Sequence, residues 1–377
     1  MSQTIAVDFE TYYDSEYSIR TLGARAYCRD ARFNPYLISV SDGTESWAGP
    51  LSKFNWASLD GATLLSHNAG FDSLVYRTLV QKGLAPQLTI PSWHCTANLS
   101  AYLCMHRDLA RASDILLKIQ VSKTERDDAE GKQWADIVAS GREAAMLEYA
   151  RGDARLCHSL WTKHGHRWPE MERRLSDWTI RACQRGVQVD MARLKEYLYV
   201  TEKAAIQAHD SLPWTQRGAK PNSPKAIAEE CRKHGIPTPP VKKHEGEEAY
   251  DQWEALYSTK LPWVASYSNY RKLNLFLDKL RTIRDRTDDQ GIFYFDLLYF
   301  GAHTGRWTGS GGFNMQNLRS IPLFIDTDGW LIFQAQRLAE LDNAMADGLA
   351  WPSYVAHVLD IRALFIARPG KKMIVCD

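Results

Sequence analysis

Five side chains within the first 155 positions have the chemistry of a metal centre: four carboxylates and one phenol. Hard divalent cations such as Mg²⁺ and Mn²⁺ prefer oxygen ligands, and carboxylates also neutralise their charge. A phenol stays protonated at neutral pH, so beside such a centre it can donate a hydrogen bond to water. These residues can form a metal site only if the fold brings them together: Asp8, Glu10, Asp72, Tyr149 and Asp153.

The first pair, Asp8 and Glu10, lies in the alternating segment I-A-V-D-F-E-T, which predicts a strand over residues 4–11. Residues two apart on a strand leave the same face, so the two carboxylates lie close together and repel. A divalent cation between them removes that repulsion. Because exposed strands also carry such pairs, the assignment needs further ligands.

Two later segments supply these ligands. In L-L-S-H-N-A-G-F-D, an apolar strand ends at His67 and Asn68, and Asp72 follows near the start of a helix, where it could also simply act in capping. In Y-A-R-G-D, Tyr149 and Asp153 are four apart and share one helix face. The alternative for this last pair is a tyrosine in a helix interface beside an unrelated surface carboxylate.

The elements that must position these residues are predicted from hydrophobic periodicity. Strands come first and helices follow, with helices also between strands, which favours a mixed α/β sheet covered by helices. The predicted strands cover residues 4–11, 35–40 and 62–66, and the predicted helices cover residues 71–82, 98–104, 110–117 and 142–164.

The order of three motifs along the chain resembles that of the DEDD exonuclease family. These motifs are D-x-E on a strand, N-x-x-F-D at a strand-to-helix junction and Y-x-x-x-D on a helix. The tyrosine subclass fits, because Tyr149 lies four residues before Asp153, and Glu148 occupies the position where the histidine subclass has its histidine. The resemblance covers roughly residues 1–165. It implies a ribonuclease-H-like fold and 3′→5′ exonuclease activity with two divalent ions, Mg²⁺ or Mn²⁺.

The resemblance also implies roles for individual residues. Asp8 would bridge both ions, Glu10 and Asp153 would complete the site that activates water, and Asp72 would act through the second ion's water shell. Tyr149 would orient the attacking water. Such a pair of ions, about 4 Å apart, stabilises both attacking and leaving oxygens. By the same resemblance, the groove that holds the terminal nucleotides would be lined by Thr11, Asn68 and Phe71.

The second half is predicted to be mainly helical from residue 167, with a short strand at 186–190, a short helix at 224–234, a basic amphipathic helix at 263–286 and a glycine-rich loop at 301–312. The run T-G-R-W-T-G-S-G-G-F-N-M-Q-N-L resembles a palm motif of DNA polymerase I-like (family A) polymerases. By that resemblance, primer–template DNA would be contacted by Thr304, Arg306, Gln316 and Asn317.

The final run, R-A-L-F-I-A-R-P-G-K-K-M-I-V-C-D, resembles the approach to the first palm aspartate of the same family, here Asp377, a polymerase metal ligand. The fingers and the second palm carboxylate of that family would lie beyond this residue. We therefore expect no polymerisation from the chain alone, and a second polypeptide could carry the rest. Residues 321–356 fit no motif of the family, and the overall variant resembles bacteriophage enzymes.

The composition excludes several other classes. No apolar run could span a bilayer and no signal peptide is present, so a cytoplasmic protein is expected, in a bacterial host if phage-encoded. Seven scattered cysteines without C-x-x-C suggest reduced thiols. Net charge is only +1, but basic residues concentrate in residues 163–185 and 271–286, either as phosphate-binding surfaces or as ordinary solvated helix faces.

The sequence thus predicts an α/β, ribonuclease-H-like exonuclease domain at 1–165, followed by a mainly helical partial thumb and palm at 166–377. The expected activity is two-metal hydrolysis of DNA 3′ ends, the proofreading part of a family A polymerase. Two alternatives stay open: an RNA exonuclease of the ribonuclease D-like type, and a non-catalytic DNA-binding subunit.

Overall fold

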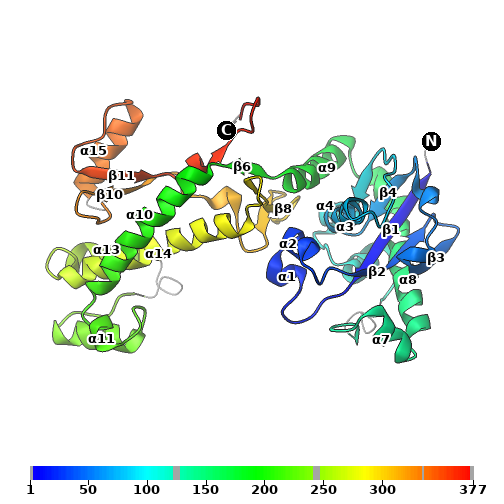
Figure 1. The fold of residues 1–377 in the computed structure, drawn as a ribbon, viewed down its shortest axis with the longest axis horizontal. Helices are drawn as coiled ribbons and strands as arrows, with labels where there is room; N and C mark the ends of the chain where they lie inside the picture. The colour runs from blue at the N-terminus through cyan, green and yellow to red at the C-terminus, as the bar shows by residue number, and fades with distance from the viewer. Residues whose placement is uncertain (1–2, 122–127, 241–246, 333–334, 374–377) are drawn as a thin grey trace. The chain divides into compact units, whose positions relative to one another are not determined.

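The structure is a computed structural model that describes residues 3–121, 128–240, 247–332 and 335–373 (Figure 1). The chain forms two compact units. The first unit comprises Met1–Gly186 and Tyr294–Gln316, and the second comprises Val187–Phe293 and Asn317–Asp377.

A five-stranded mixed sheet in the order β3-β2-β1-β4-β5 forms the centre of the first unit. Central β1 pairs antiparallel with β2 and parallel with β4, so the parallel half of the sheet needs helical crossovers. The strands are β1 (Thr4–Thr11), β2 (Pro35–Ser41), β3 (Ser46–Pro50), β4 (Thr63–Ser66) and β5 (Trp93–Cys95).

Helices cover both faces of this sheet (Figure 1). Alternate β1 residues such as Val7 and Phe9 pack into one core with Val75 of α3, whereas Ala6, on the opposite face, packs with Cys157 of α8. The helices of this unit are α1 (Ile19–Leu22), α2 (Ala24–Arg29), η1 (Leu51–Lys53), η2 (Trp56–Leu59), α3 (Ala69–Gln81), α4 (Thr96–Cys104), α5 (Leu109–Ala112), η3 (Ser113–Leu117), α7 (Trp134–Ala139), α8 (Glu143–His164), η4 (Gly165–Arg167) and α9 (Glu170–Arg185).

The segment predicted as a glycine-rich loop, residues 301–312, is mostly a loop, and only its residues 308–310 form a strand. Strands β8 (Asp296–Leu298) and β9 (Thr308–Ser310) pair antiparallel and pack on α9. Trp307 Nε1 donates to Thr179 Oγ1 at 2.9 Å. Strand β9 requires glycine at position 309, because a Cβ there would meet Asn314 at 2.6 Å.

The second unit is mainly helical, as predicted, and is built on the packing of α10 against α14. A small antiparallel sheet in the order β12-β6-β7 completes it. Its elements are β6 (Val187–Val189), α10 (Met191–Asp210), η5 (Thr215–Arg217), α11 (Pro224–Lys233), α13 (Glu247–Tyr257), α14 (Pro262–Arg286), β7 (Ile292–Phe293), β10 (Leu323–Asp326), α15 (Ala335–Ala346), β11 (Val355–Leu359), η7 (Arg362–Leu364) and β12 (Phe365–Ile366), while η6 (Met315–Asn317) crosses from one unit into the other.

Residues 321–356, which fit no motif, form a small module of two antiparallel strands, β10 and β11, with α15. Its core contains Phe324, Ile332 and Leu341. It is tied to α14 by Asn269, whose buried side-chain oxygen accepts from the Leu331 amide at 2.7 Å. The described residues of this segment therefore belong to the second unit.

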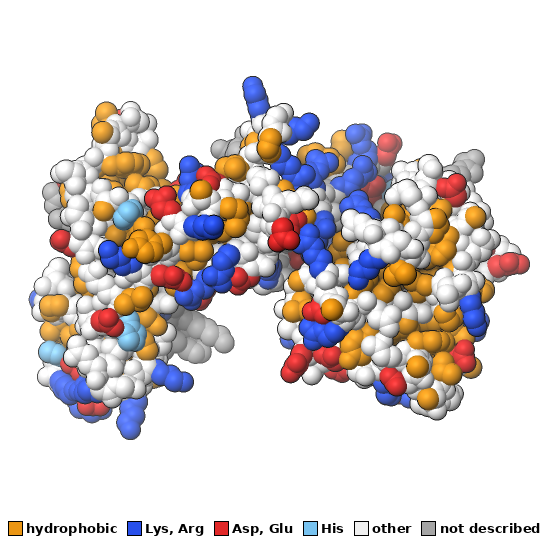
Figure 2. All heavy atoms as spheres, in the orientation of Figure 1, with side chains coloured by type: hydrophobic (Ala, Val, Ile, Leu, Met, Phe, Trp, Pro, Cys, Tyr) orange, Lys and Arg blue, Asp and Glu red, His pale blue; other side chains and the backbone are white. Residues whose placement is uncertain are grey.

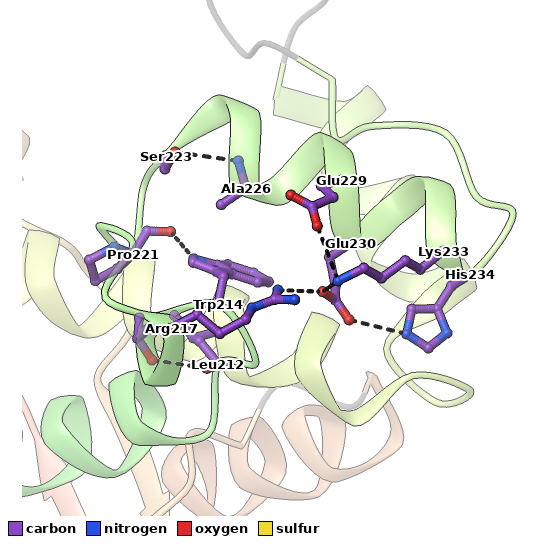
Figure 3. Close-up of polar contacts among 11 residues, drawn as sticks. Leu212, Trp214, Arg217, Pro221, Ser223, Ala226, Glu229, Glu230, Lys233 and His234 are labelled. Atoms are coloured by element: carbon purple, nitrogen blue, oxygen red, sulfur yellow. Dashed lines mark hydrogen bonds and ion pairs between the residues drawn. The ribbon is translucent and has the colours of Figure 1, made fainter.

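A buried ion cluster stabilises the region around α11 (Figure 3). Glu230 is only 6% exposed and accepts from Arg217 at 3.0 Å and Lys233 at 3.2 Å, with His234 at 3.5 Å. Burial by itself would raise the pKa of Glu230, but the hydrogen bonds from Lys233 and Arg217 outweigh it, so the pKa is lowered. The indole of Trp214 packs beside this cluster and donates to the Pro221 carbonyl.

All six cysteines within the described residues are free thiols, in agreement with the sequence prediction. No helix in the described part of the chain combines the length and apolar character required to cross a bilayer.

Candidate metal-dependent active site

Strand pairing and packing place Asp8 and Glu10 on the α8 side of the sheet. Since Ala6 faces α8 and side chains alternate along β1, the even-numbered residues continue along that face. Both carboxylates are partly buried. The D-x-E pair therefore points into the space between the sheet and α8, as the strand prediction required.

Helix α8 brings the third carboxylate to the same place. It packs its buried residues Ala150, Ala154 and Cys157 inward, and Asp153 lies next to this inner stripe. Ligand oxygens of Asp8, Glu10 and Asp153 all lie within 4.8 Å of one another. Three carboxylates at this separation repel strongly, and a cation coordinated between them would remove that repulsion.

Asp72 lies outside this cluster but lines the same groove, in the first turn of α3. Its side chain is 2% exposed, and its Oδ1 accepts from the Phe9 amide at 3.3 Å. Burial and the negative charge of Asp8 raise the pKa of Asp72 well above its usual range. The simple helix-capping alternative fits poorly, since the observed bond joins Asp72 to β1.

Tyr149 lies one helical turn before Asp153 and is partly buried against the cluster of Tyr36, Leu37 and Met146. Burial, and then the negative charges of Asp153 and Glu10, raise its pKa. The phenol therefore remains protonated at neutral pH, where its hydroxyl can donate or accept a hydrogen bond but does not act as a base.

These residues line one open groove with a volume of about 1060 Å³. The three nucleotide-contact residues predicted in this domain also line it: Thr11, Asn68 and Phe71. Asn68 has a φ of 112°, the left-handed region that non-glycine residues rarely adopt, directly before α3 begins. Such strain persists only where the surrounding structure enforces it, which is common at functional sites.

His67 and Arg107 also line the groove, although neither was predicted from the sequence as a site residue. His67 Nε2 hydrogen-bonds to the Arg107 carbonyl at 2.7 Å, which ties the end of β4 to this loop. Arg107 Nη1 donates to Asn98, while its buried Nη2 has no hydrogen-bond partner within the described residues. A guanidinium that lines an acidic groove supplies positive charge with which a phosphate could pair. No local pattern marks Arg107, because only the fold brings its loop to the groove.

The oxygen-only donor set fits Mg²⁺ or Mn²⁺, because three clustered carboxylates and a buried fourth supply hard ligands and negative charge. Asp8, Glu10 and Asp153 would hold such an ion, which when bound acts as a Lewis acid on a phosphoryl oxygen. The chain itself positions these carboxylates on two rigid elements, and the Tyr149 phenol can orient water.

Comparisons with known proteins support the fold. No protein-family model matches the sequence, and neither does any curated protein. Among solved structures, the POL domain of Pol1 from M. smegmatis, in complex with DNA primer-template and dNTP, aligns over 84% of this chain at 14% identity with a TM-score of 0.53. The chain spans 52% of that protein's length. Brucella melitensis NrnC with bound Mg²⁺ aligns over 48% of this chain and 81% of its own, at 18% identity and a TM-score of 0.34.

The Pol1 alignment and the observed sheet confirm the predicted fold class: a mixed α/β part with a central sheet, followed by a mainly helical part. At this level of identity the likeness concerns the fold alone.

Four residues predicted on the polymerase side are exposed and do not line the acidic groove: Thr304, Arg306, Gln316 and Asn317. Thr304 and Arg306 lie in the β8–β9 hairpin loop, and Gln316 follows the hairpin, all in the first unit. Asn317 belongs to the second unit and lines a hollow of about 620 Å³. Asp377 lies outside the described residues.

Proposed function

We propose that the chain is a metal-dependent 3′→5′ exonuclease that hydrolyses DNA 3′ ends, acting as the proofreading part of a family A type polymerase. One observation carries the proposal: the oxygens of Asp8, Glu10 and Asp153 cluster within 4.8 Å at the floor of a groove that also contains Asp72 and Tyr149. The residues that the DEDD resemblance requires, scattered over the sequence, line a single site.

Two bound ions are proposed, in line with that resemblance. Asp8, Glu10 and Asp153 would hold one, and Asp72 would contribute to the second through its water shell. Tyr149, kept protonated by burial and by its acidic neighbours, would orient the attacking water. Arg107, whose side chain lines the same groove, would supply positive charge for a phosphate of the terminal nucleotide. Single-stranded and frayed ends suit an open groove, because they need no unpairing before they enter it.

The test is a trimming assay with a single-stranded DNA labelled at its 5′ end, in Mg²⁺ or Mn²⁺. We expect a ladder of products shortened from the 3′ end, no products in EDTA, and none with the Asp8→Ala, Glu10→Ala double variant. The Glu143→Gln variant is the matched control, since this exposed carboxylate lies on α8 but away from the groove.

Full activity of the double variant would contradict the assignment of the site. A matched RNA oligonucleotide in the same assay decides the substrate class: preference for RNA would replace the DNA proposal with the ribonuclease D-like alternative. Absence of both trimming and Mn²⁺ binding would favour the non-catalytic alternative.

A further inference from the structure

Helix α9 of the first unit presents one face to solvent that the proposed active site does not use. Its inward face is anchored by buried Ser176, Thr179 and Gln184, and Gln184 Nε2 donates to Ser73 Oγ of α3 at 2.7 Å. Along the opposite face, exposed side chains recur every three or four residues, the spacing of one helical stripe: Met171, Arg174, Trp178, Arg181 and Arg185.

Trp178 at the centre of this stripe is 74% exposed. An indole is one of the largest apolar side chains, and leaving it in water forgoes most of the stabilisation that its burial would give. It is the most exposed of the large apolar side chains in the described residues. An external partner with a flat surface on which the indole could stack would bury it.

The charge around Trp178 indicates which kind of partner this is. Arg174 and Arg181 lie one turn before and one turn after it, and Figure 2 shows Lys and Arg side chains gathered over α9. Arg181 stays 65% exposed even though Asp177 lies 3.9 Å away, so this weak ion pair leaves most of its guanidinium accessible. An aromatic ring flanked by guanidinium groups matches the alternation of bases and phosphates in a nucleic acid strand.

A hollow of about 420 Å³ adjoins the stripe and shares Arg181 with it. On the far wall, α3 contributes Arg77, and Trp93 adds a second aromatic side chain. Helix α3 also borders the acidic groove, through Phe71 and Asp72 on a different face. Helix α3 therefore borders both the hollow next to the α9 stripe and the acidic groove, within the same unit.

From these features we infer that the α9 stripe is a second binding surface, separate from the acidic groove, for single-stranded DNA. Arg174, Arg181 and Arg77 contact phosphates, and a base stacks on Trp178. From Arg174 to Arg185 the helix rises about 16 Å, the length of roughly five stacked nucleotides. A surface of this kind would hold the strand whose 3′ end is being trimmed, so this role rests on the proposed function, whereas the binding itself does not.

The experiment measures binding of a fluorescein-labelled oligothymidylate to the full chain by anisotropy, in EDTA so that no cleavage occurs. Trp178→Ala should weaken binding about tenfold, and Trp178→Phe should retain most of the affinity because it keeps a stacking ring. The Arg174→Ala, Arg181→Ala double variant should lower the slope of log affinity against log salt by about 1.4, the value for two phosphate contacts on a single strand.

Two controls on the same unit separate these effects from general surface changes. Leu84→Ala removes another exposed apolar side chain, and Lys53→Ala removes another exposed positive charge. Both should bind like the wild type. Thermal unfolding of each variant shows that the fold is intact, which the exposure of the substituted side chains leads us to expect.

Unchanged affinity in Trp178→Ala, or a wild-type chain that fails to bind at low salt, would overturn the inference. A change in oligomeric state on Trp178→Ala without any change in DNA affinity would also overturn it, since the stripe would then be a protein interface. Trimming assays in Mg²⁺ keep the two proposals apart. Trimming without α9-dependent binding rejects only the second surface, and α9-dependent binding without trimming rejects only the exonuclease.

Discussion

Two buried carboxylates, one in each unit, lie in opposite electrostatic surroundings. Asp72 in the first unit lies beside another acid, Asp8, and its pKa is raised by burial and by that charge. Glu230 in the second unit is surrounded by Arg217, Lys233 and His234, and its pKa is lowered despite burial (Figure 3).

The difference separates a charge that the fold itself neutralises from one that the proposed function assigns to a metal site. Around Glu230 the protein supplies its own cations, so the site is complete and stabilises α11 and the loop before it. Around Asp72 the protein gathers further carboxylates, so folding concentrates negative charge that a bound cation would offset. Accumulated like charge inside a groove is therefore the stronger sign of function, and substitutions at the two sites test this contrast.

The largest effect is expected when the acidic cluster loses one charge. Asp153→Asn keeps the shape but removes a proposed metal ligand, so trimming should fall about a thousandfold, as several kcal/mol of transition-state stabilisation are lost. Glu148→Gln is the control on the same helix, because Glu148 is exposed and pairs with Arg151 and Arg155. Trimming rates within twofold of the wild type for both variants would show that Asp153 contributes no more to activity than Glu148 does.

Metal binding should stabilise the first unit. At a concentration of about one hundred times Kd, Mn²⁺ would contribute about 2.7 kcal/mol, which for a unit of this size shifts Tm by roughly 5–10 °C. The shift should vanish in the Asp8→Ala variant and persist in Glu230→Gln, as measured by thermal unfolding in Mn²⁺ against EDTA. An equal shift in Asp8→Ala would place the ion elsewhere.

Asp72→Asn should stabilise the metal-free protein by about 1–3 kcal/mol at neutral pH, because it removes a buried charge beside Asp8 while keeping an oxygen for the Phe9 amide. The folded pKa of Asp72 is raised above its usual 3.8, so the wild type loses stability as pH rises from about 4 through the raised value. The gain in unfolding free energy from Asp72→Asn should therefore disappear in acid. Denaturant unfolding in EDTA at several pH values measures this gain, and a variant less stable than the wild type at neutral pH would contradict the prediction.

Glu230→Gln should destabilise the second unit by about 1–2 kcal/mol, because Arg217 and Lys233 lose their shared counter-charge but remain about half exposed. The folded pKa of Glu230 is lowered below its usual 4.5, so its contribution is present above that pH and is lost as pH falls through the lowered value. In the same unfolding series, the difference in unfolding free energy between the wild type and Glu230→Gln should be largest at neutral pH and should disappear in acid. Trimming activity should stay unchanged.

Many local elements were predictable because each depends on near neighbours in the chain. Strand β1 was predicted with its observed bounds, and α8 and α14 differ from prediction by one residue at one end. Where a segment is short, prediction was weaker: β5 was missed, and the helix predicted at 110–117 is divided into α5 and η3. A three-residue strand has too few residues to show an alternating pattern, so only its pairing partner defines it.

The site divides in the same way. The sequence by itself determined the residue types, and the spacing of Asp8 and Glu10 on a strand and of Tyr149 and Asp153 on a helix determined which of them share a face. Only the tertiary structure decided that these two faces meet, because the sheet order and the packing of α8 depend on contacts between residues more than one hundred positions apart. The same long-range packing brought Arg107 to the groove, buried Asp72 beside Asp8 and left Trp178 in solvent. Residue spacing cannot specify these outcomes, since burial and charge depend on which elements pack together.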